Sequence, residues 1–315
     1  MLLHEHLENG ADKNPNFPFS EFEGNSLSYQ EANLLSNQLA NKLVYEGLEV
    51  GDRFAFLAKN CTEMAIMYYA ASKVGAVPVP LNYRLADQEW AYIINDSEAK
   101  LIIVKGNEYS DRINQISSEL KNVKKYISIS LDNSIEKFQD FYDWLSDSSN
   151  EKPTLKIHEN DDVYQMYTSG TTGHPKGAVL LQRNVAANIR QYLNSLTLPR
   201  PSRTLLVAPM YHAAAMINMC GCIAIGGTIV IQEDFIPQDV VDCLANEKIT
   251  HTVLVPAMIQ ACLVSVPNVA NNEYNDLDQI HYGASPIAPE TLKKAMDVFK
   301  CKFGQGFGMT ETVAV

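Results

Sequence analysis

Apolar and polar residues follow two patterns along the chain, and together these patterns predict strands that alternate with helices. Apolar residues at helical spacing, with Ser28 and Glu31 arranged as in a capping box, predict an amphipathic helix over residues 28–45. Short apolar runs with many branched residues predict strands. The further helices are expected at residues 63–74, 112–120 and 212–225 and from residues 184 and 237, and the strands at 53–58, 76–80, 101–104, 126–130, 163–168, 178–181, 204–208, 228–231 and 251–255. A further strand and helix are expected to flank residues 282–285.

This order of elements predicts the fold class. Strands that alternate with helices form βαβ units, which pair their strands in parallel. We therefore expect an α/β protein made of repeated βαβ units, with mostly parallel sheets flanked by helices. Residues 131–160 are acidic and rich in Ser and Asn, and residues 147–153 resemble a linker most closely. The predicted subdomains are residues 1–155 and 156–315.

Composition narrows the class of protein further. Apolar residues make up 46% and charged residues 20% of the 315 residues, which is typical of soluble globular domains. The net charge of −12 disfavours nucleic acid and anionic membranes as partners. The sequence has neither a signal-peptide pattern at its start nor an apolar run long enough for a transmembrane segment. We expect a cytoplasmic protein, and its oligomeric state stays open.

The six cysteines include no Cys-x-x-Cys pair, and Cys220 and Cys222 lack a second pair at zinc spacing. Reduced thiols that are mostly buried are therefore expected.

A stretch rich in glycine and hydroxyl groups, directly after a predicted strand, carries the candidate chemistry. It runs Tyr167-Thr-Ser-Gly-Thr-Thr-Gly-His-Pro-Lys-Gly177. Hydroxyl groups can hydrogen-bond a phosphate, glycine lets the backbone approach a ligand, and lysine adds positive charge. These features predict a phosphate-binding loop, against the plain alternative of a polar surface turn. The candidate ligands are Thr168, Ser169, Gly170, Thr171, Thr172, Gly173 and Lys176.

The loop is not a Walker A motif, because Pro175 precedes the lysine and Gly177 follows it where Ser or Thr would be needed. Instead the stretch resembles the signature loop YTSGTTGxPKG of acyl-adenylate-forming enzymes, a superfamily that includes acyl-CoA synthetases, aryl-CoA ligases, luciferases and peptide synthetase adenylation domains. The resemblance extends over nearly the whole chain. The segments that carry it are Leu27-Ser-Tyr-Gln-Glu31, Gly75-Ala-Val-Pro-Val-Pro-Leu-Asn82, Pro209-Met-Tyr-His212, Tyr282-Gly-Ala-Ser285 and Gly306-Phe-Gly-Met-Thr-Glu311.

By this resemblance, the loop from Thr168 to Lys176 closes over the triphosphate of ATP, and Glu311 holds Mg²⁺, with Thr168 as a second ligand. A carboxylate together with substrate phosphates is a typical magnesium environment. Thr310 is expected close to the reacting phosphate. The resemblance places the remaining nucleotide-binding residues in two groups, Gly283, Ala284 and Ser285 beside adenine and Gly306, Phe307 and Gly308 near the nucleotide.

The implied reaction is attack of a carboxylate on the α-phosphorus of ATP, followed by capture of the acyl group by coenzyme A. Lys176, Thr310 and His212 are the expected catalytic residues, with His212 shaping the acid site and not acting as a base. Ala215 and Met216 are expected to line that site with His212. Residues 213–218 contain no acidic side chain that could bind an amino group, so a fatty acid is favoured, then an aryl acid.

The resemblance also implies parts that no residue here supplies: a ribose-binding aspartate, a hinge and a mobile C-terminal domain with a catalytic lysine. We therefore interpret residues 1–315 as an incomplete N-terminal AMP-binding domain with little or no complete turnover. Two alternatives stay open, a kinase or nucleotidase with another phosphate loop and a nucleotide-binding module without catalysis. The acceptor, whether coenzyme A, a carrier-protein thiol or oxygen, is also open.

Overall fold

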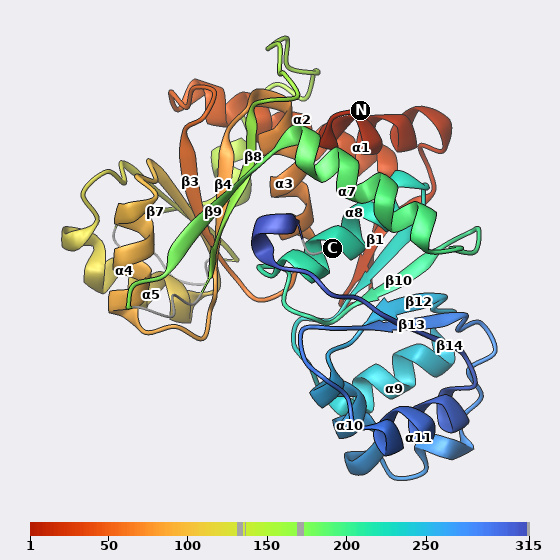
Figure 1. Ribbon diagram of the computed structural model, residues 1–315. Coiled ribbons are helices and arrows are strands. Elements are labelled where there is room, and N and C mark those ends of the chain that lie inside the picture. Colours follow the sequence, from red (N-terminus) through yellow and green to blue (C-terminus); the bar gives the residue numbers. More distant parts are fainter. Residues whose placement is uncertain (131–134, 136, 169–172, 314–315) are drawn as a thin grey trace. The chain divides into compact units, whose positions relative to one another are not determined.

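The computed structural model describes residues 1–130, 135, 137–168 and 173–313, in which strands and helices alternate (Figure 1). The chain forms two compact units. Unit 1 comprises Met1–Glu8, Gln30–Lys59 and Glu63–Ala186, and unit 2 comprises Asn9–Tyr29, Asn60–Thr62 and Ala187–Val315. The predicted subdomains 1–155 and 156–315 divide the chain at a different place, and they stay a prediction.

Unit 1 contains a sheet of five parallel strands in the order β4-β3-β5-β6-β7. Their apolar runs are buried, as expected of parallel strands covered by helices. The strands are β3 (Arg53–Leu57), β4 (Val77–Leu81), β5 (Leu101–Lys105), β6 (Lys125–Ile129) and β7 (Phe138–Asp140). The helices in or entering this unit are α1 (Leu3–Lys13), α2 (Tyr29–Tyr45), α3 (Thr62–Val74), α4 (Asp87–Asp96), α5 (Asn107–Ile116), η1 (Ser117–Glu119) and α6 (Phe141–Leu145).

The last two strands of unit 1 form a hairpin, which is an exception among the parallel pairs of this unit. Strands β8 (Asp162–Thr168) and β9 (Lys176–Leu181) pair antiparallel, and β8 lies beside β4. The physical reason is the short connection between them, because parallel neighbours need a crossover of a dozen or more residues. Helix α7 (Gln182–Ser195) follows directly.

Unit 2 contains a sheet of seven strands in the order β14-β13-β12-β10-β11-β1-β2, and every neighbouring pair except β1–β2 is parallel. The carboxyl ends of the six parallel strands therefore lie along one edge. The strands are β1 (Pro18–Phe22), β2 (Asn25–Ser28), β10 (Arg203–Leu206), β11 (Thr228–Ile231), β12 (His251–Val253), β13 (Gln279–Tyr282) and β14 (Lys302–Gln305).

Helices cover both faces of this sheet (Figure 1). α8 (Ala213–Ala224) packs on β10, β11 and β12, while α9 (Pro237–Asn246), α10 (Pro256–Ser265) and α11 (Pro289–Phe299) pack together on the other face. A hydrophobic core that includes Leu205, Leu244, Ile280 and Phe299 fills the space beneath these three helices. Two short 3₁₀ segments, η2 (Val269–Asn271) and η3 (Thr310–Thr312), complete the unit.

The expected α/β class with mostly parallel sheets flanked by helices is confirmed. Most predicted strands are present within a residue or two of the expected bounds. The sequence pattern did not identify the apolar helix α10, nor several elements that are short, polar or mixed: α1, β1, β2, α4, β7, α6 and β14.

Candidate functional site

The candidate phosphate loop connects the two strands of the β8–β9 hairpin in unit 1. Thr168 and Lys176 face each other at the mouth of the hairpin, where the Thr168 hydroxyl lies 3.5 Å from the Lys176 carbonyl. The Lys176 side chain is exposed, so its ammonium can reach a ligand. Gly173 has a φ of +132°, a backbone conformation that favours glycine. Ser169, Gly170, Thr171 and Thr172 lie outside the described residues, and their roles stay predictions.

Side chains attach the loop end of this hairpin to α4. The Tyr167 hydroxyl donates to Asp96 Oδ2 at 2.7 Å and accepts from Gln165 Nε2 at 3.1 Å. Burial and then the hydrogen bond to Asp96 raise the pKa of Tyr167, so the phenol stays protonated and can donate. Two residues before β9, His174 stacks on Tyr92 with ring centroids 4.6 Å apart. The loop therefore starts and ends at anchored residues.

Gly177 makes the close pairing of this hairpin possible. A β-carbon at this position would overlap the Gln165 side-chain amide and lie 2.9 Å from Cζ of Tyr167. The Tyr167 ring therefore occupies the space that a side chain at Gly177 would need. The resemblance identified this glycine as part of a motif, and the hairpin gives its physical reason.

In unit 2, three further motifs meet along the carboxyl edge of the sheet. Residues 209–212 follow β10, residues 283–285 follow β13, and residues 306–311 follow β14. From β10 the chain runs through α8 to β11, the neighbour on one side. The neighbour on the other side, β12, leads into α10. Ligands of open α/β sheets bind at the carboxyl ends of strands where such connections diverge.

The loops after β13 and β14 are in direct backbone contact. The Gly306 amide donates to the Tyr282 carbonyl at 2.8 Å, and a β-carbon on Gly283 would lie 2.5 Å from the Gly306 carbonyl oxygen. Ala284 then adopts a φ of +67°, which is uncommon for a residue with a side chain. Ala284 and Ser285 are exposed. The backbone geometry thus presents both loops to solvent at one place.

The segment from Phe307 to Glu311 is open to solvent. The Phe307 side chain is 84% exposed and Met309 is 53% exposed. Thr310 and Glu311 lie in η3, which is closed by hydrogen bonds between the Thr312 hydroxyl and the Met309 backbone and is tied to α7 through Asn188. An exposed aromatic ring on a solvent-exposed loop is suited to stacking on a planar ring.

The side chain of Glu311 is accessible to a metal ion. Its carboxylate is exposed and forms no salt bridge within the described residues. No group of three or more His, Cys, Asp or Glu side chains in the described ranges could hold a metal by itself. A magnesium ion shared between one carboxylate and substrate phosphates needs no such group. The magnesium assignment of Glu311 and Thr168 stays a prediction.

His212 is the N-cap residue of α8, and its amide donates to the Pro209 carbonyl at 3.0 Å. Its imidazole is exposed and packs against the Tyr211 ring, with centroids 4.4 Å apart. Ala215 and Met216, one turn further along, are buried at 1% and 0% exposure. The chain therefore exposes His212 and covers the other two, and their role in binding an acid stays a prediction.

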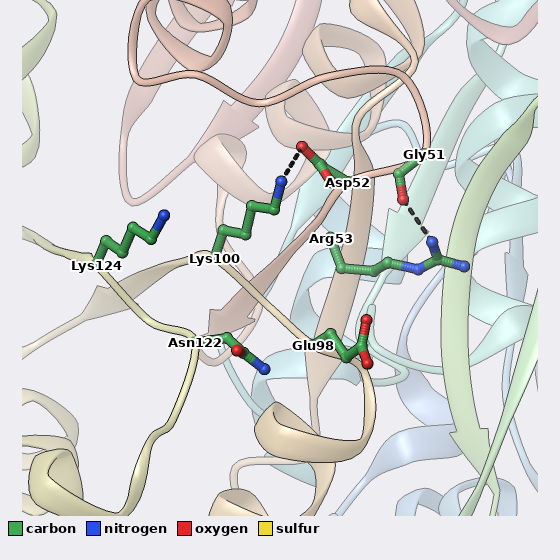
Figure 2. A pocket seen from close by; sticks show the side chains of 7 residues that line it. All are labelled: Gly51, Asp52, Arg53, Glu98, Lys100, Asn122 and Lys124. Carbon is green, nitrogen blue, oxygen red and sulfur yellow. Dashed lines mark hydrogen bonds and ion pairs between the residues drawn. The ribbon is translucent and has the colours of Figure 1, made fainter.

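A cavity lies elsewhere, at the amino ends of β3, β5 and β6 in unit 1 (Figure 2). It measures about 160 Å³. Lys100 Nζ lies 2.6 Å from Asp52 Oδ2, and Arg53 donates to the Gly51 carbonyl and to Asp162. These cations are paired, and the cavity is at the sheet edge opposite to the carboxyl ends, so we assign it no ligand. Its lining residues are Gly51, Asp52, Arg53, Glu98, Lys100, Asn122 and Lys124.

All six cysteines are free, and five of them are buried, as the sequence predicted. Burial raises the pKa of Cys222, Cys243, Cys262 and Cys301 to about 12. Neutral thiols are poor nucleophiles, so these four side chains are not suited to carrying an acyl group. No described helix has the length and apolar character that crossing a membrane requires.

A family model and individual relatives both match nearly the whole chain. Residues 7–315 match the family model of the AMP-binding enzymes. The chain is 30% identical over 288 residues to the long-chain-fatty-acid–CoA ligase FadD13 of Mycobacterium tuberculosis, covering 91% of this chain and 55% of that protein. It is 31% identical over 310 residues to the fatty acid–[acyl-carrier-protein] ligase ScoC of Streptomyces coeruleorubidus, covering 96% and 57%.

Among solved structures, the inhibitor-bound N-terminal domain of FACL13 from Mycobacterium tuberculosis superposes with a TM-score of 0.90 at 26% identity, covering 99% of this chain and 77% of that chain. The chain thus spans about half the length of the curated relatives that it matches. A family match over nearly all residues, with the motifs in family order, establishes the membership of the chain. It belongs to the AMP-binding enzyme family.

Proposed function

We propose that the protein to which this chain belongs uses ATP to activate a carboxylic acid and then transfers the acyl group to coenzyme A. A carboxylate oxygen attacks the α-phosphorus of ATP, forming an acyl-adenylate, and the bond to pyrophosphate breaks. The sulfur of coenzyme A then attacks the acyl carbonyl carbon, AMP leaves, and the thiol proton passes to solvent. Atoms and charges balance in both steps.

The observation that carries the proposal is the gathering of three sequence motifs on one sheet edge. Residues 209–212, 283–285 and 306–311 are separate in the sequence, yet each lies within three residues of the end of a parallel strand whose carboxyl end is on that edge. Family membership supports the assignment of this edge to nucleotide and acid.

The chain's own residues supply positioning and charge. Carboxylate and triphosphate repel each other, so groups that neutralise the phosphates lower the barrier to their reaction. The exposed ammonium of Lys176 and the hydroxyl of Thr168 act on the phosphates, and Thr310 acts close to the α-phosphorus. Bound Mg²⁺ would supply further charge neutralisation through Glu311 and Thr168.

We infer a fatty acid as the substrate class. α8 begins at the acid side of the proposed site and carries no charged residue from Ala213 to Ala224. An apolar helix start is suited to an alkyl chain and offers nothing to an amino group. The name of the relative FadD13 points the same way. The acceptor is less constrained, since ScoC is named as a ligase that uses acyl-carrier protein.

The test is carboxylate-dependent exchange of labelled pyrophosphate into ATP. The full-length protein is assayed beside this 315-residue chain, with acids from acetate to palmitate, benzoate and several amino acids. We expect exchange by the full-length protein with fatty acids, little or no complete turnover by the chain alone, and no exchange with amino acids. ATP binding without exchange for any acid would instead support a binding module without catalysis.

A further inference from the structure

The side chain of Asn60 joins two strand ends of unit 2. It lies in the segment Asn60–Thr62 and is 2% exposed. Its Nδ2 donates to the carbonyls of Ala208 and Gln232, both at 3.1 Å, and its Oδ1 accepts from the Met210 amide at 2.8 Å. One amide side chain therefore uses both of its donors and its acceptor on backbone groups.

These bonds extend the sheet beyond its last strand–strand hydrogen bond. β10 and β11 are parallel neighbours that end at Leu206 and Ile231, and the Gln232 amide donates to the Leu206 carbonyl at 3.0 Å. Beyond that point β10 leads to α8 and β11 leads to α9. Buried backbone groups need partners, and Asn60 supplies three of them where the ladder has stopped.

The segment held in this way leads to the candidate acid site. Ala208 and Met210 flank Pro209, whose carbonyl accepts from the His212 amide at 3.0 Å. His212 in turn accepts from the amides of Ala215 and Met216, which starts α8. The position of the His212 backbone therefore depends on the same short turn that Asn60 fastens.

We propose that Asn60 is a positioning residue for the carboxylic acid substrate, acting through the Ala208–Met210 backbone on His212 and the start of α8. This inference rests on the proposed function. Asn60 forms no part of the phosphate-loop hairpin or of the loops after β13 and β14, so its contribution concerns the acid and not ATP.

Asparagine suits this position because it combines two donors with one acceptor on a short side chain. A carboxylate there keeps the acceptor for the Met210 amide but places negative charge against two carbonyl oxygens. A protonated carboxyl group recovers one donor. Asn60→Asp should therefore be defective in a way that depends on pH, whereas Asn60→Ala should be defective at every pH.

The experiment uses the full-length protein and measures KM for the acid and for ATP separately in the pyrophosphate exchange assay. Asn25→Asp is the matched control, because Asn25 is an exposed asparagine of the same unit with a single hydrogen bond to a backbone carbonyl. For Asn60→Asp we expect the acid KM to rise about tenfold, equal to about 1.4 kcal/mol, with the ATP KM changed less than about twofold. The defect should shrink between pH 8 and pH 5.5.

A second pair of variants keeps the inference testable if Asn60→Asp does not fold. Asn60→Ser introduces one hydroxyl that can donate and accept. It should also raise the KM for the acid and not the KM for ATP, but by a smaller factor than Asn60→Asp. In a His212→Ala background the effect of Asn60 substitution on the acid KM should largely disappear. Equal increases in both KM values, or an unchanged acid KM, would overturn the inference, whereas absence of exchange by the unsubstituted protein would overturn the proposed function.

Discussion

The candidate phosphate loop of unit 1 is held by side chains, whereas the candidate nucleotide loops of unit 2 are held by backbone. In unit 1 the hairpin base depends on Tyr167 with Asp96 and on His174 with Tyr92. In unit 2 the loops after β13 and β14 touch at Gly283 and Gly306, where a side chain at Gly283 would overlap the Gly306 carbonyl oxygen. Side-chain anchors can be weakened in small steps, but a backbone contact tolerates little change in volume.

The largest effect is expected from removing the positive charge of Lys176, where β9 begins. Lys176→Ala should lower the rate of acyl-adenylate formation by about 10²–10³, because a positioned charge that stabilises developing negative charge is lost. Measurement of pyrophosphate exchange under saturating ATP tests this. Lys302→Ala, which removes another exposed lysine from the end of a strand, should leave the rate unchanged. A comparable loss in both variants would contradict a specific role for Lys176.

The backbone contact of unit 2 can be broken by a single β-carbon. Gly283→Ala should reduce the free energy of unfolding by about 1–3 kcal/mol, because the added carbon overlaps the Gly306 carbonyl oxygen and the backbone must move. Gly306→Ala is the matched control, since nothing lies within 4 Å of a β-carbon there. Urea titration of both variants measures the difference. Equal destabilisation would show that the close approach is not the cause.

Loss of a side-chain anchor in unit 1 should destabilise the protein less than the Gly283→Ala substitution does. Tyr167→Phe removes one hydroxyl and leaves Asp96 exposed to water, so the expected loss of stability is about 1 kcal/mol. ATP affinity should fall with it, because the loop base becomes looser. Isothermal titration with ATP, alongside urea titration, checks both effects. If Tyr167→Phe proved as damaging as Gly283→Ala, the contrast between the two kinds of support would be wrong.

The smallest effect concerns acid stability in unit 2. Burial lowers the pKa of His251 to about 3 from its ordinary value of 6.5. The unfolded chain therefore binds a proton between these values that the folded chain does not, and stability falls as pH drops below 6.5. Between pH 6.5 and 5.5 this costs about 1 kcal/mol. His251→Asn should flatten that part of the stability curve in urea titrations, and an unchanged slope would contradict this contribution.

The fold was largely predictable because its strands are buried apolar runs. LIIV within β5 and TIVI in β11 can be recognised from composition alone, since parallel strands are covered on both faces. The direction in which β8 pairs with β9 was not predicted, because an apolar run does not indicate its direction. α10 was missed because its apolar residues surround the helix and give no clear helical period.

Residues of the candidate site that belong to a sequence motif could be named from the sequence. Residues that support the site through tertiary contacts could not. Gly283, Gly306 and Lys176 stand within recognisable segments. Asp96 and Asn60 are ordinary polar residues in the sequence, and their partners Tyr167 and Met210 are distant along the chain. The one local signal available was a short polar residue soon after a buried strand, since Asn60 lies three residues beyond the end of β3.

The most direct test of the account follows the oxygen atoms of the acid. The full-length protein is given a fatty acid labelled with ¹⁸O in its carboxylate, together with ATP and coenzyme A, and the products are examined by mass spectrometry. Attack on the α-phosphorus predicts one labelled oxygen in AMP and none in pyrophosphate. Labelled inorganic phosphate with ADP would instead indicate an acyl phosphate, and would contradict the assignment of this chain to acyl-adenylate formation.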